Sequence, residues 1–328
     1  MASYPSWVDP LHPVALIEYA IYTPPTEEMI TTIGDWIDQR ISGGYIYGPS
    51  RYGKSRAVKW HVRNVLHERF KMAIPLVVWI RRESAMSEGE FWNSLLAAAK
   101  FEFHDPLQPK TKTAARFLFE QLLITVARSA RCNYVVLIID EAHAMTLREW
   151  NWLLGLQNVL DEQGFRLTTI SIGSHGLLFQ QNYLTRTGNS HICARFFACD
   201  VRFNGIGSED QLGYVLNGYD VDSEWPKKSG QSYLQYFAPD YFKAGQRFKN
   251  HGSVIWTAFM DLRPPNIASN KKIPKEIPMQ HLAHSIEQAL RRLAGGEEWA
   301  KVMEYKSWLG MIEKTGFTKH MQKLLVNA

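Results

Sequence analysis

The sequence has only three cysteines among its 328 residues, and it has no apolar run long enough to cross a bilayer. Cys132, Cys193 and Cys199 do not show the paired spacing of metal ligands, so we expect neither a zinc site nor a disulfide. The first residues lack the basic and apolar regions of a secretory signal. The sequence therefore favours a soluble protein of the reducing cytoplasm without a membrane partner.

Positive charge is concentrated in one part of the chain. The net charge is +5, but residues 46–131 contain 15 Lys and Arg against 7 Asp and Glu. Residues 1–45 contain one Arg against six acidic residues. A basic excess of this kind suits a polyanion that is bound through its phosphates. Charge alone does not distinguish a nucleic acid from a bound nucleotide.

One segment fits the phosphate-binding pattern G-x-x-x-x-G-K-[ST]. It consists of Gly48, Pro49, Ser50, Arg51, Tyr52, Gly53, Lys54 and Ser55. A strand-like run, Tyr45–Tyr47, precedes it and a helical stretch follows, as this loop requires. In that geometry backbone N–H groups surround the phosphates, Lys54 reaches the β and γ oxygens, and the Ser55 hydroxyl binds Mg²⁺. The segment therefore predicts binding of ATP with Mg²⁺, and the alternative is a glycine-rich turn without a ligand.

A second motif is the unbroken apolar run Val135–Ile139, which ends in Asp140 and Glu141. A strand that is apolar on both faces belongs to the middle of a parallel sheet, whose carboxyl ends carry the functional groups. We expect Asp140 to hold Mg²⁺, directly or through water, and Glu141 to accept a proton from the attacking water. The alternatives are a helix cap for Asp140 and a solvated first-turn carboxylate for Glu141.

Strand-like and helical segments alternate along the first two thirds of the chain. We expect further strands at 73–80, 167–172 and 196–203, and helices at 26–41, 87–101, 113–130 and 147–163. This order predicts an α/β fold with a parallel five-stranded sheet between two layers of helices. An amphipathic helix at 281–293 lies in a later region that we expect to be mainly helical.

The two motifs, with a strand between them in the sequence, resemble the AAA+ P-loop ATPases. Together with the run Ile170–Ser174 and the pair Arg195-Phe196, they resemble the AAA+ regulators of DNA transposition, the TnsC/TniB family. The short chain is similar to family members found in CRISPR-associated transposons. The resemblance covers about residues 14–205. His143 departs from the Gln often found there, and Tyr52 is bulky for this loop.

The resemblance implies a domain plan and further roles. Residues 1–44 would lead to the nucleotide pocket, 45–205 would form the AAA+ core, 206–296 a helical lid, and 297–328 a helical segment that could dock a partner. Ser174 would act as sensor 1, with His175 as second choice and a plain turn as the alternative. Arg195 would be an arginine finger that acts on a neighbouring subunit, with Arg186 as competitor and an arginine on the domain surface as the alternative. Arg291 or Arg292 could serve as sensor 2, but an exposed basic helix end is the favoured interpretation of this pair.

The family resemblance also implies a function and partners. It implies an ATPase that assembles as a homo-oligomeric ring or filament on duplex DNA and links a target-selection protein or complex to transposase subunits. We expect Arg81, Arg82, Lys110 and Lys112 to bind DNA phosphates without sequence preference, or else to be solvated, with Arg148 or the loop 271–275 as replacements. The alternative functions are a helicase loader or initiator, and a signalling or scaffold NTPase that does not bind DNA.

Overall fold

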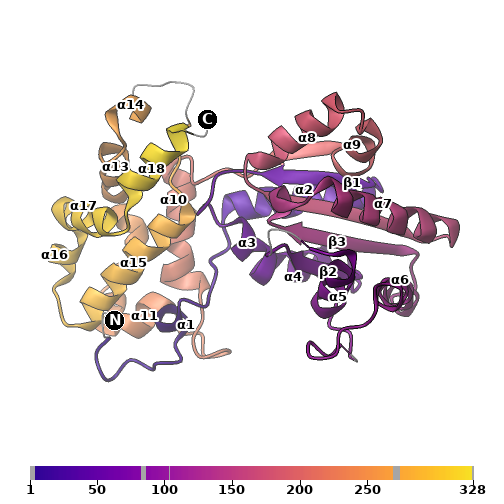
Figure 1. The fold of residues 1–328 in the computed structure, drawn as a ribbon. Helices are drawn as coiled ribbons and strands as arrows, with labels where there is room; N and C mark the ends of the chain where they lie inside the picture. The colour runs from indigo at the N-terminus through magenta and orange to yellow at the C-terminus, as the bar shows by residue number, and fades with distance from the viewer. Residues whose placement is uncertain (1–3, 83–85, 103, 269–273, 327–328) are drawn as a thin grey trace. The chain divides into compact units, whose positions relative to one another are not determined.

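The computed structural model describes residues 4–82, 86–102, 104–268 and 274–326 (Figure 1). Its contacts divide the chain into two compact units. The first, which we call the sheet unit, comprises Glu28–Ser50 and Lys54–Phe203. The second, the helical unit, comprises Met1–Glu27, Arg51–Gly53 and Asn204–Ala328.

The sheet unit contains five parallel strands. They are β1 (Gly43–Tyr47), β2 (Leu76–Ile80), β3 (Tyr134–Asp140), β4 (Arg166–Gly173) and β5 (Cys199–Arg202). The strand order is β2-β3-β4-β1-β5, which confirms the predicted α/β class and parallel five-stranded sheet. The strand between β1 and β3 in the sheet is β4, whereas β2, which separates them in the sequence, lies at the edge. The carboxyl ends of β3, β4 and β1 are therefore neighbours.

Helices pack against this sheet. They are α2 (Pro24–Asp38), α3 (Lys54–Ala57), α4 (Arg63–Phe70), α5 (Glu88–Ala98), α6 (Lys112–Ser129), α7 (Leu147–Glu162), α8 (Gly176–Arg186) and α9 (Ser190–Phe196). A π-helical segment, Val58–Val62, joins α3 to α4. Successive residues of β3 face opposite sides of the sheet, and Val135 to Ile139 are all buried. Both faces of β3 are therefore covered, as a strand in a three-layer fold requires.

The boundaries of most predicted elements agree with the structure to within a few residues, but one strand is shorter than predicted. The sequence predicts a strand throughout 196–203, whereas β5 begins only at Cys199. Helix α9 occupies Ser190–Phe196, because Ile192 and Phe196 lie four residues apart and are both buried in the apolar cluster of the sheet unit. Capping boxes begin α5, with Ser87 and Glu90, and α7, with Thr146 and Glu149.

The helical unit has an apolar core of its own. Its helices are α1 (Pro13–Leu16), α10 (Glu209–Asn217), α11 (Tyr233–Phe237), α12 (Pro239–Lys243), α13 (Gly252–Asp261), α14 (Pro265–Ala268), α15 (Met279–Ala294), α16 (Trp299–Met303), α17 (Tyr305–Lys314) and α18 (Phe317–Val326). Val14 and Tyr19 are buried in the same cluster as Phe259 and Trp308, so the start of the chain packs with these later helices. The predicted helical C-terminal region is confirmed, and the division into four segments stays a prediction. None of the described helices is both long and apolar enough to cross a membrane.

Candidate nucleotide-binding site

The predicted phosphate loop connects β1 to α3. The Gly48 N–H donates to the carbonyl oxygen of Gly173, 3.2 Å away, which ties the start of the loop to the end of β4. A Cβ atom at Gly48 would lie 2.7 Å from the carbonyl oxygen of Phe203, so only glycine fits there. Arg51 and Gly53 adopt left-handed backbone conformations, with φ of 68° and 111°. Left-handed residues within a turn point successive N–H groups into a concave surface that suits an anion.

Lys54 begins α3 and is almost fully buried. Its Nζ donates hydrogen bonds to the carbonyl oxygens of Gly48, at 2.8 Å, and Pro49, at 2.7 Å, so the ammonium lies inside the curve of the loop. Burial lowers the pKa of Lys54 to about 8, although the charges of Glu141 and Asp140 act in the opposite direction. Ser55 follows in the first turn of the helix and is exposed. The loop therefore presents a buried cation next in sequence to an exposed serine.

The two acidic residues lie at the end of β3. Asp140 is 4% exposed, and its Oδ1 accepts the N–H of Glu141 at 3.0 Å. Glu141 has a left-handed backbone, with φ of 59°, and its side chain is half exposed. The strand thus ends in a buried carboxylate, followed by a sharp turn that sends the next carboxylate toward solvent. This arrangement suits a metal ligand followed by a base that water can reach.

The end of β4 supplies the predicted sensor residues. The Ser174 Oγ accepts the N–H of Gly176 at 3.2 Å, at the start of α8, and the Ser174 N–H donates to Nδ1 of His143 at 3.4 Å. His175 lies close enough to Lys54 to respond to its charge. Burial first, then the positive charges of Arg202 and Lys54, lower the pKa of His175. Both candidates for sensor 1 are therefore at the same edge of the sheet as the loop, and their roles stay predictions.

Arg202 also lies at the carboxyl ends of the strands, and the sequence analysis did not predict it as a site residue. It is the last residue of β5 and pairs in register with Tyr47, directly before the phosphate loop. Its positive charge is one of the causes that lower the pKa of His175, after burial. The available signal was its position at the carboxyl end of a predicted strand in a parallel sheet, where functional groups gather.

The residues at the carboxyl ends of the strands fit the phosphate chain and the Mg²⁺ ion that the motif predicts. The loop N–H groups and Lys54 suit a phosphate chain, and Ser55 with Asp140 suits Mg²⁺. In the described residues, no three His, Cys, Asp or Glu side chains cluster as a metal site. Mg²⁺ in such sites takes only one or two ligands from the protein and completes its shell with phosphate oxygens and water. A site with Ser55 and Asp140 as its protein ligands therefore stays a prediction.

Arg195 lies near the amino end of β1, whereas the phosphate loop follows the carboxyl end of this strand. It is in the last turn of α9, and its carbonyl oxygen accepts the Ser42 hydroxyl at 3.1 Å, next to the amino end of β1. Its Nη1 is 3.2 Å from Oδ2 of Asp161, and both side chains are about two fifths exposed. Arg195 is thus separate from the site of its own chain, and an action on a neighbour stays a prediction. Arg186, the competing candidate, ends α8 and is exposed.

Arg81 does not fit its predicted role in DNA binding. Its side chain is buried, and its Nη2 is 2.9 Å from Oε1 of Glu149, which is buried as well. The Nε and Nη1 atoms of Arg81 make no hydrogen bond within the described part of the chain. The prediction is therefore wrong for Arg81 in this conformation, because a DNA phosphate cannot reach a guanidinium that is closed off from solvent.

The other predicted DNA contacts are accessible to different degrees. Arg82 is exposed. Lys110 is half buried, and its backbone is fixed by two hydrogen bonds to the Asn93 side chain, at 2.8 and 2.9 Å. Lys112 begins α6 with an exposed side chain whose Nζ is 3.3 Å from Oε2 of Glu88. In the alternative loop 271–275, residues 271–273 lie outside the described residues.

The predicted sensor 2 arginines lie at the far end of α15. The first turn of this helix is next to the loop, because the Gln280 N–H donates to the carbonyl oxygen of Arg51 at 3.0 Å. Arg291 is 11 residues further on, which at 1.5 Å per residue is about 16 Å along the axis. Arg292 pairs with Glu297 instead, at 2.6 Å. A sensor 2 role for either arginine stays a prediction.

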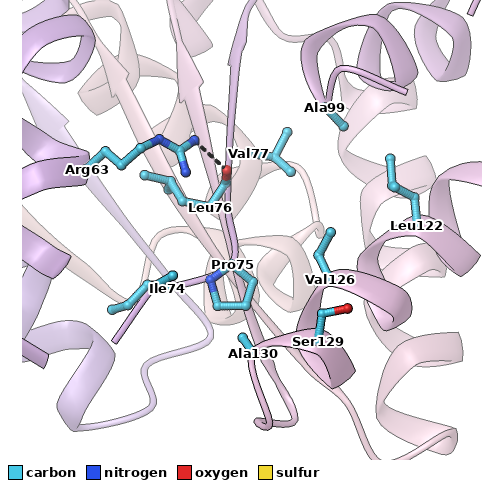
Figure 2. Close-up of a pocket in the computed structure, with 11 residues that line it drawn as sticks. Arg63, Ile74, Pro75, Leu76, Val77, Ala99, Leu122, Val126, Ser129 and Ala130 are labelled. Atoms are coloured by element: carbon cyan, nitrogen blue, oxygen red, sulfur yellow. Dashed lines mark hydrogen bonds between the residues drawn. The ribbon is translucent and has the colours of Figure 1, made fainter. Parts of the chain in front are cut away.

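A separate apolar cleft lies at the amino end of β2, away from Asp140 (Figure 2). It has a volume of about 340 Å³ and is lined mainly by Ile74, Leu76, Leu122 and Val126. Arg63 is its charged residue, and Nη2 of Arg63 donates to the Leu76 carbonyl oxygen at 2.9 Å. The cleft offers no catalytic constellation, and the carboxyl edge of the sheet remains the candidate site.

The fold is the P-loop α/β fold of the AAA+ type. Residues 38–180 match the family model described as the AAA domain. The comparison with curated proteins gives no match to the sequence.

Two solved structures share the fold over most of the chain. The Aeropyrum pernix ORC2 protein, in its ADPNP and ADP complexes, gives a TM-score of 0.57 at 12% identity, over 92% of this chain and 71% of the other. The Drosophila ORC bound to DNA gives 0.53 at 12% identity, over 89% of this chain and 67% of the other. At these identities the similarity shows the fold alone.

Proposed function

We propose that this protein is an ATP-dependent regulator of DNA transposition that assembles as a homo-oligomer on duplex DNA. The observation that carries the nucleotide part is the buried Lys54 ammonium within the loop, close to the carboxylates of Asp140 and Glu141. Support for the transposition part comes from the sequence resemblance to the TnsC/TniB family. The partners would be transposase subunits and a target-selection protein or complex, and the localisation would be cytoplasmic.

Each side chain of the site would have its own role in ATP hydrolysis. The loop N–H groups and Lys54 would hold the phosphates, and Ser55 with Asp140 would hold Mg²⁺. Bound Mg²⁺ would neutralise charge that develops on the phosphate oxygens. Glu141 is outside the buried part of the site, where its carboxylate can orient a water molecule and take its proton. Ser174 or His175 would contact the terminal phosphate from the end of β4, and Arg195 would act on the site of a neighbouring subunit.

The first test separates nucleotide binding from hydrolysis. We expect Lys54→Ala to abolish ATP binding, because it removes the cation from the loop. Glu141→Gln should bind ATP normally but hydrolyse it about 10² to 10⁴ times more slowly, since it removes only the base. Electron microscopy of the Glu141→Gln protein with ATP and duplex DNA should show a trapped assembly that is missing without either ligand. Full turnover by Glu141→Gln would remove Glu141 from the catalytic role.

A replication initiator or helicase loader is the second candidate. The structural similarity to two ORC proteins favours it, and one of these is described as bound to DNA. Both candidates predict assembly on duplex DNA, so the partner decides between them. Co-assembly with a transposase supports the first candidate, and co-assembly with a replicative helicase supports the second. Assembly that is indifferent to duplex DNA would favour a signalling or scaffold NTPase.

A further inference from the structure

His143 lies two residues after Glu141, in the short turn Ala142–Ala144. The mechanism above gives it no role, yet one of its ring nitrogens faces two functional elements. Nδ1 is 3.5 Å from Oε2 of Glu141, and it accepts the Ser174 N–H at 3.4 Å. The same atom therefore contacts the proposed base and the residue that follows β4.

The imidazole lies against the turn between β4 and α8, where two glycines leave space for it. A Cβ atom at Gly173 would lie 3.1 Å from Nδ1 and 3.2 Å from the backbone nitrogen of His143. A Cβ atom at Gly176 would lie 3.3 Å from Cβ of His143. Two glycines thus leave space for the ring on the turn between β4 and α8. With the ring on this turn, Nδ1 lies 3.5 Å from Oε2 of Glu141 and 3.4 Å from the Ser174 nitrogen.

Ser174 and Glu141 require different protonation states of Nδ1. The Ser174 N–H is a donor and needs the lone pair of Nδ1, which places the ring proton on Nε2. The ionised carboxylate of Glu141 is only an acceptor and needs a proton on Nδ1. A single nitrogen cannot satisfy both neighbours at once. The position of the ring proton therefore decides whether His143 binds the carboxylate or the backbone of Ser174.

We propose that His143 is a positioning residue for Glu141 and couples the base to the end of β4. This inference rests on the proposed ATP hydrolysis. With the proton on Nδ1, the imidazole donates to one oxygen of the Glu141 carboxylate and orients the other toward the attacking water. With the proton on Nε2, the ring accepts the Ser174 N–H and the carboxylate loses this support. The hydrogen bond from Ser174 to His143 would thereby influence the base through the imidazole ring.

Three substitutions test the proposal through steady-state ATP hydrolysis. His143→Phe keeps a ring on Gly173 and Gly176 but removes both nitrogens, and His143→Ala removes the ring as well. His143→Gln provides an amide that can donate to Glu141 or accept from Ser174. We expect His143→Phe and His143→Ala to lower kcat about 10- to 100-fold with little change in KM, and His143→Gln to recover most of the loss.

Stability and coupling to Glu141 serve as controls. Thermal unfolding of each variant shows whether the turn still folds. In a Glu141→Gln background, His143→Phe should cause little further loss, because residues that act as one unit are not additive. Wild-type kcat for His143→Phe, or a Gln variant no better than Phe, would overturn the proposal. An equal loss in both backgrounds would also overturn it, because the effect would then not pass through Glu141.

Nuclear magnetic resonance distinguishes failure of this inference from failure of the proposed function. If the wild-type protein does not hydrolyse ATP, the proposed function fails, but the contact remains testable. In protein labelled with ¹⁵N-histidine, the His143 ring signals are assigned by their loss in His143→Gln. We expect the Nδ1 signal to move toward that of an unprotonated nitrogen in Glu141→Gln, because the charged acceptor is gone. Identical ring signals in wild type and Glu141→Gln would contradict the coupling.

Discussion

Lys54 combines two properties that are difficult to reconcile in one side chain. It must be charged to bind phosphate, yet its burial lowers its pKa to about 8. Phosphate oxygens favour the charged form, so nucleotide binding should raise this pKa again. The ammonium group is therefore closer to losing its proton before binding than after it.

This property predicts a pH dependence of ATP affinity. Below pH 8 the free protein already carries the proton on Lys54, and affinity should be constant. Above pH 8 binding must take up a proton, so affinity should fall by up to about tenfold per pH unit. Calorimetric titration with ATP in buffers of different ionisation enthalpy measures both the affinity and the proton uptake.

The matched control is Lys54→Arg, because a guanidinium keeps its charge throughout this range. Its affinity is expected to be lower through altered geometry, but independent of pH between 8 and 9.5. Constant wild-type affinity over the same interval would contradict a depressed pKa at Lys54.

Single residues also show where sequence reasoning reaches its limit. The loop from Gly48 to Ser55 and the pair Asp140-Glu141 were predictable, because each pattern is local and its spacing reflects the geometry of phosphate binding. The burial of Arg81 was not predictable, because its partner Glu149 is distant in the sequence. Nothing in the segment around Arg81 indicates which helix will cover it.

Among the secondary-structure elements, β2 and α7 are joined by the ion pair of Arg81 with Glu149. Arg81 follows β2, and its N–H donates to the carbonyl oxygen of Asp140 at 2.9 Å. Glu149 belongs to the capping box of α7, where its Oε2 accepts the backbone N–H and hydroxyl of Thr146. The ion pair therefore connects the end of the edge strand to the start of the helix that follows Glu141.

Removal of one partner from this buried ion pair should be costly. We expect Arg81→Met to lower the free energy of unfolding by about 3–5 kcal/mol, because it leaves the Glu149 carboxylate buried without a cation. The double variant with Glu149→Gln should lose less than the sum of the two single losses. Urea denaturation measures all three.

Arg82→Met is the control for this experiment. Its side chain is exposed, and we expect a change within about 0.5 kcal/mol. If Arg81→Met costs no more than Arg82→Met, the ion pair contributes nothing to folding.

The order of strands shows what periodicity can and cannot predict. Apolar runs and flanking turns indicated a strand near each of the five positions, most clearly for β3, which is buried on both faces. The pairing of β4 between β1 and β3 depends on long-range contacts that no local pattern encodes. The length of β5 was overestimated, because the apolar residues of α9 continue into it and the boundary has no glycine or proline.

At the scale of the whole molecule, the proposed DNA contact remains to be located. After the exclusion of Arg81, the accessible lysines near the start of α6 are Lys110 and Lys112. The ion pair of Lys112 with Glu88 is largely solvated, so it should not compete strongly with a phosphate.

We expect Lys110→Ala with Lys112→Ala to weaken duplex binding about equally on all sequences. The slope of log affinity against log salt should become shallower by about one for each phosphate that the variant no longer binds. Fluorescence anisotropy with two unrelated duplexes at several salt concentrations measures both quantities.

Lys71→Ala with Lys100→Ala is a control with the same change in charge. Both side chains are exposed, and they follow the last turns of α4 and α5. An equal decrease in affinity in the two double variants would indicate a general effect of charge. Unchanged binding in the Lys110 and Lys112 variant would move the DNA surface elsewhere, for which Arg148 is the next candidate.

The π-helical segment Val58–Val62 has a consequence for how this chain can change over evolution. Lys54, Val58, Val62 and Leu66 are each four residues apart, and all are buried. In a regular α-helix a spacing of four turns by about 40° per step, so Leu66 would face about 120° away from Lys54. The wider π turn reduces this drift. Deletion of one residue between 58 and 62 would restore regular α-helical winding. Lys54 in the loop and Leu66 in the core could then not both keep their positions. This stretch should therefore tolerate substitution better than a change in length.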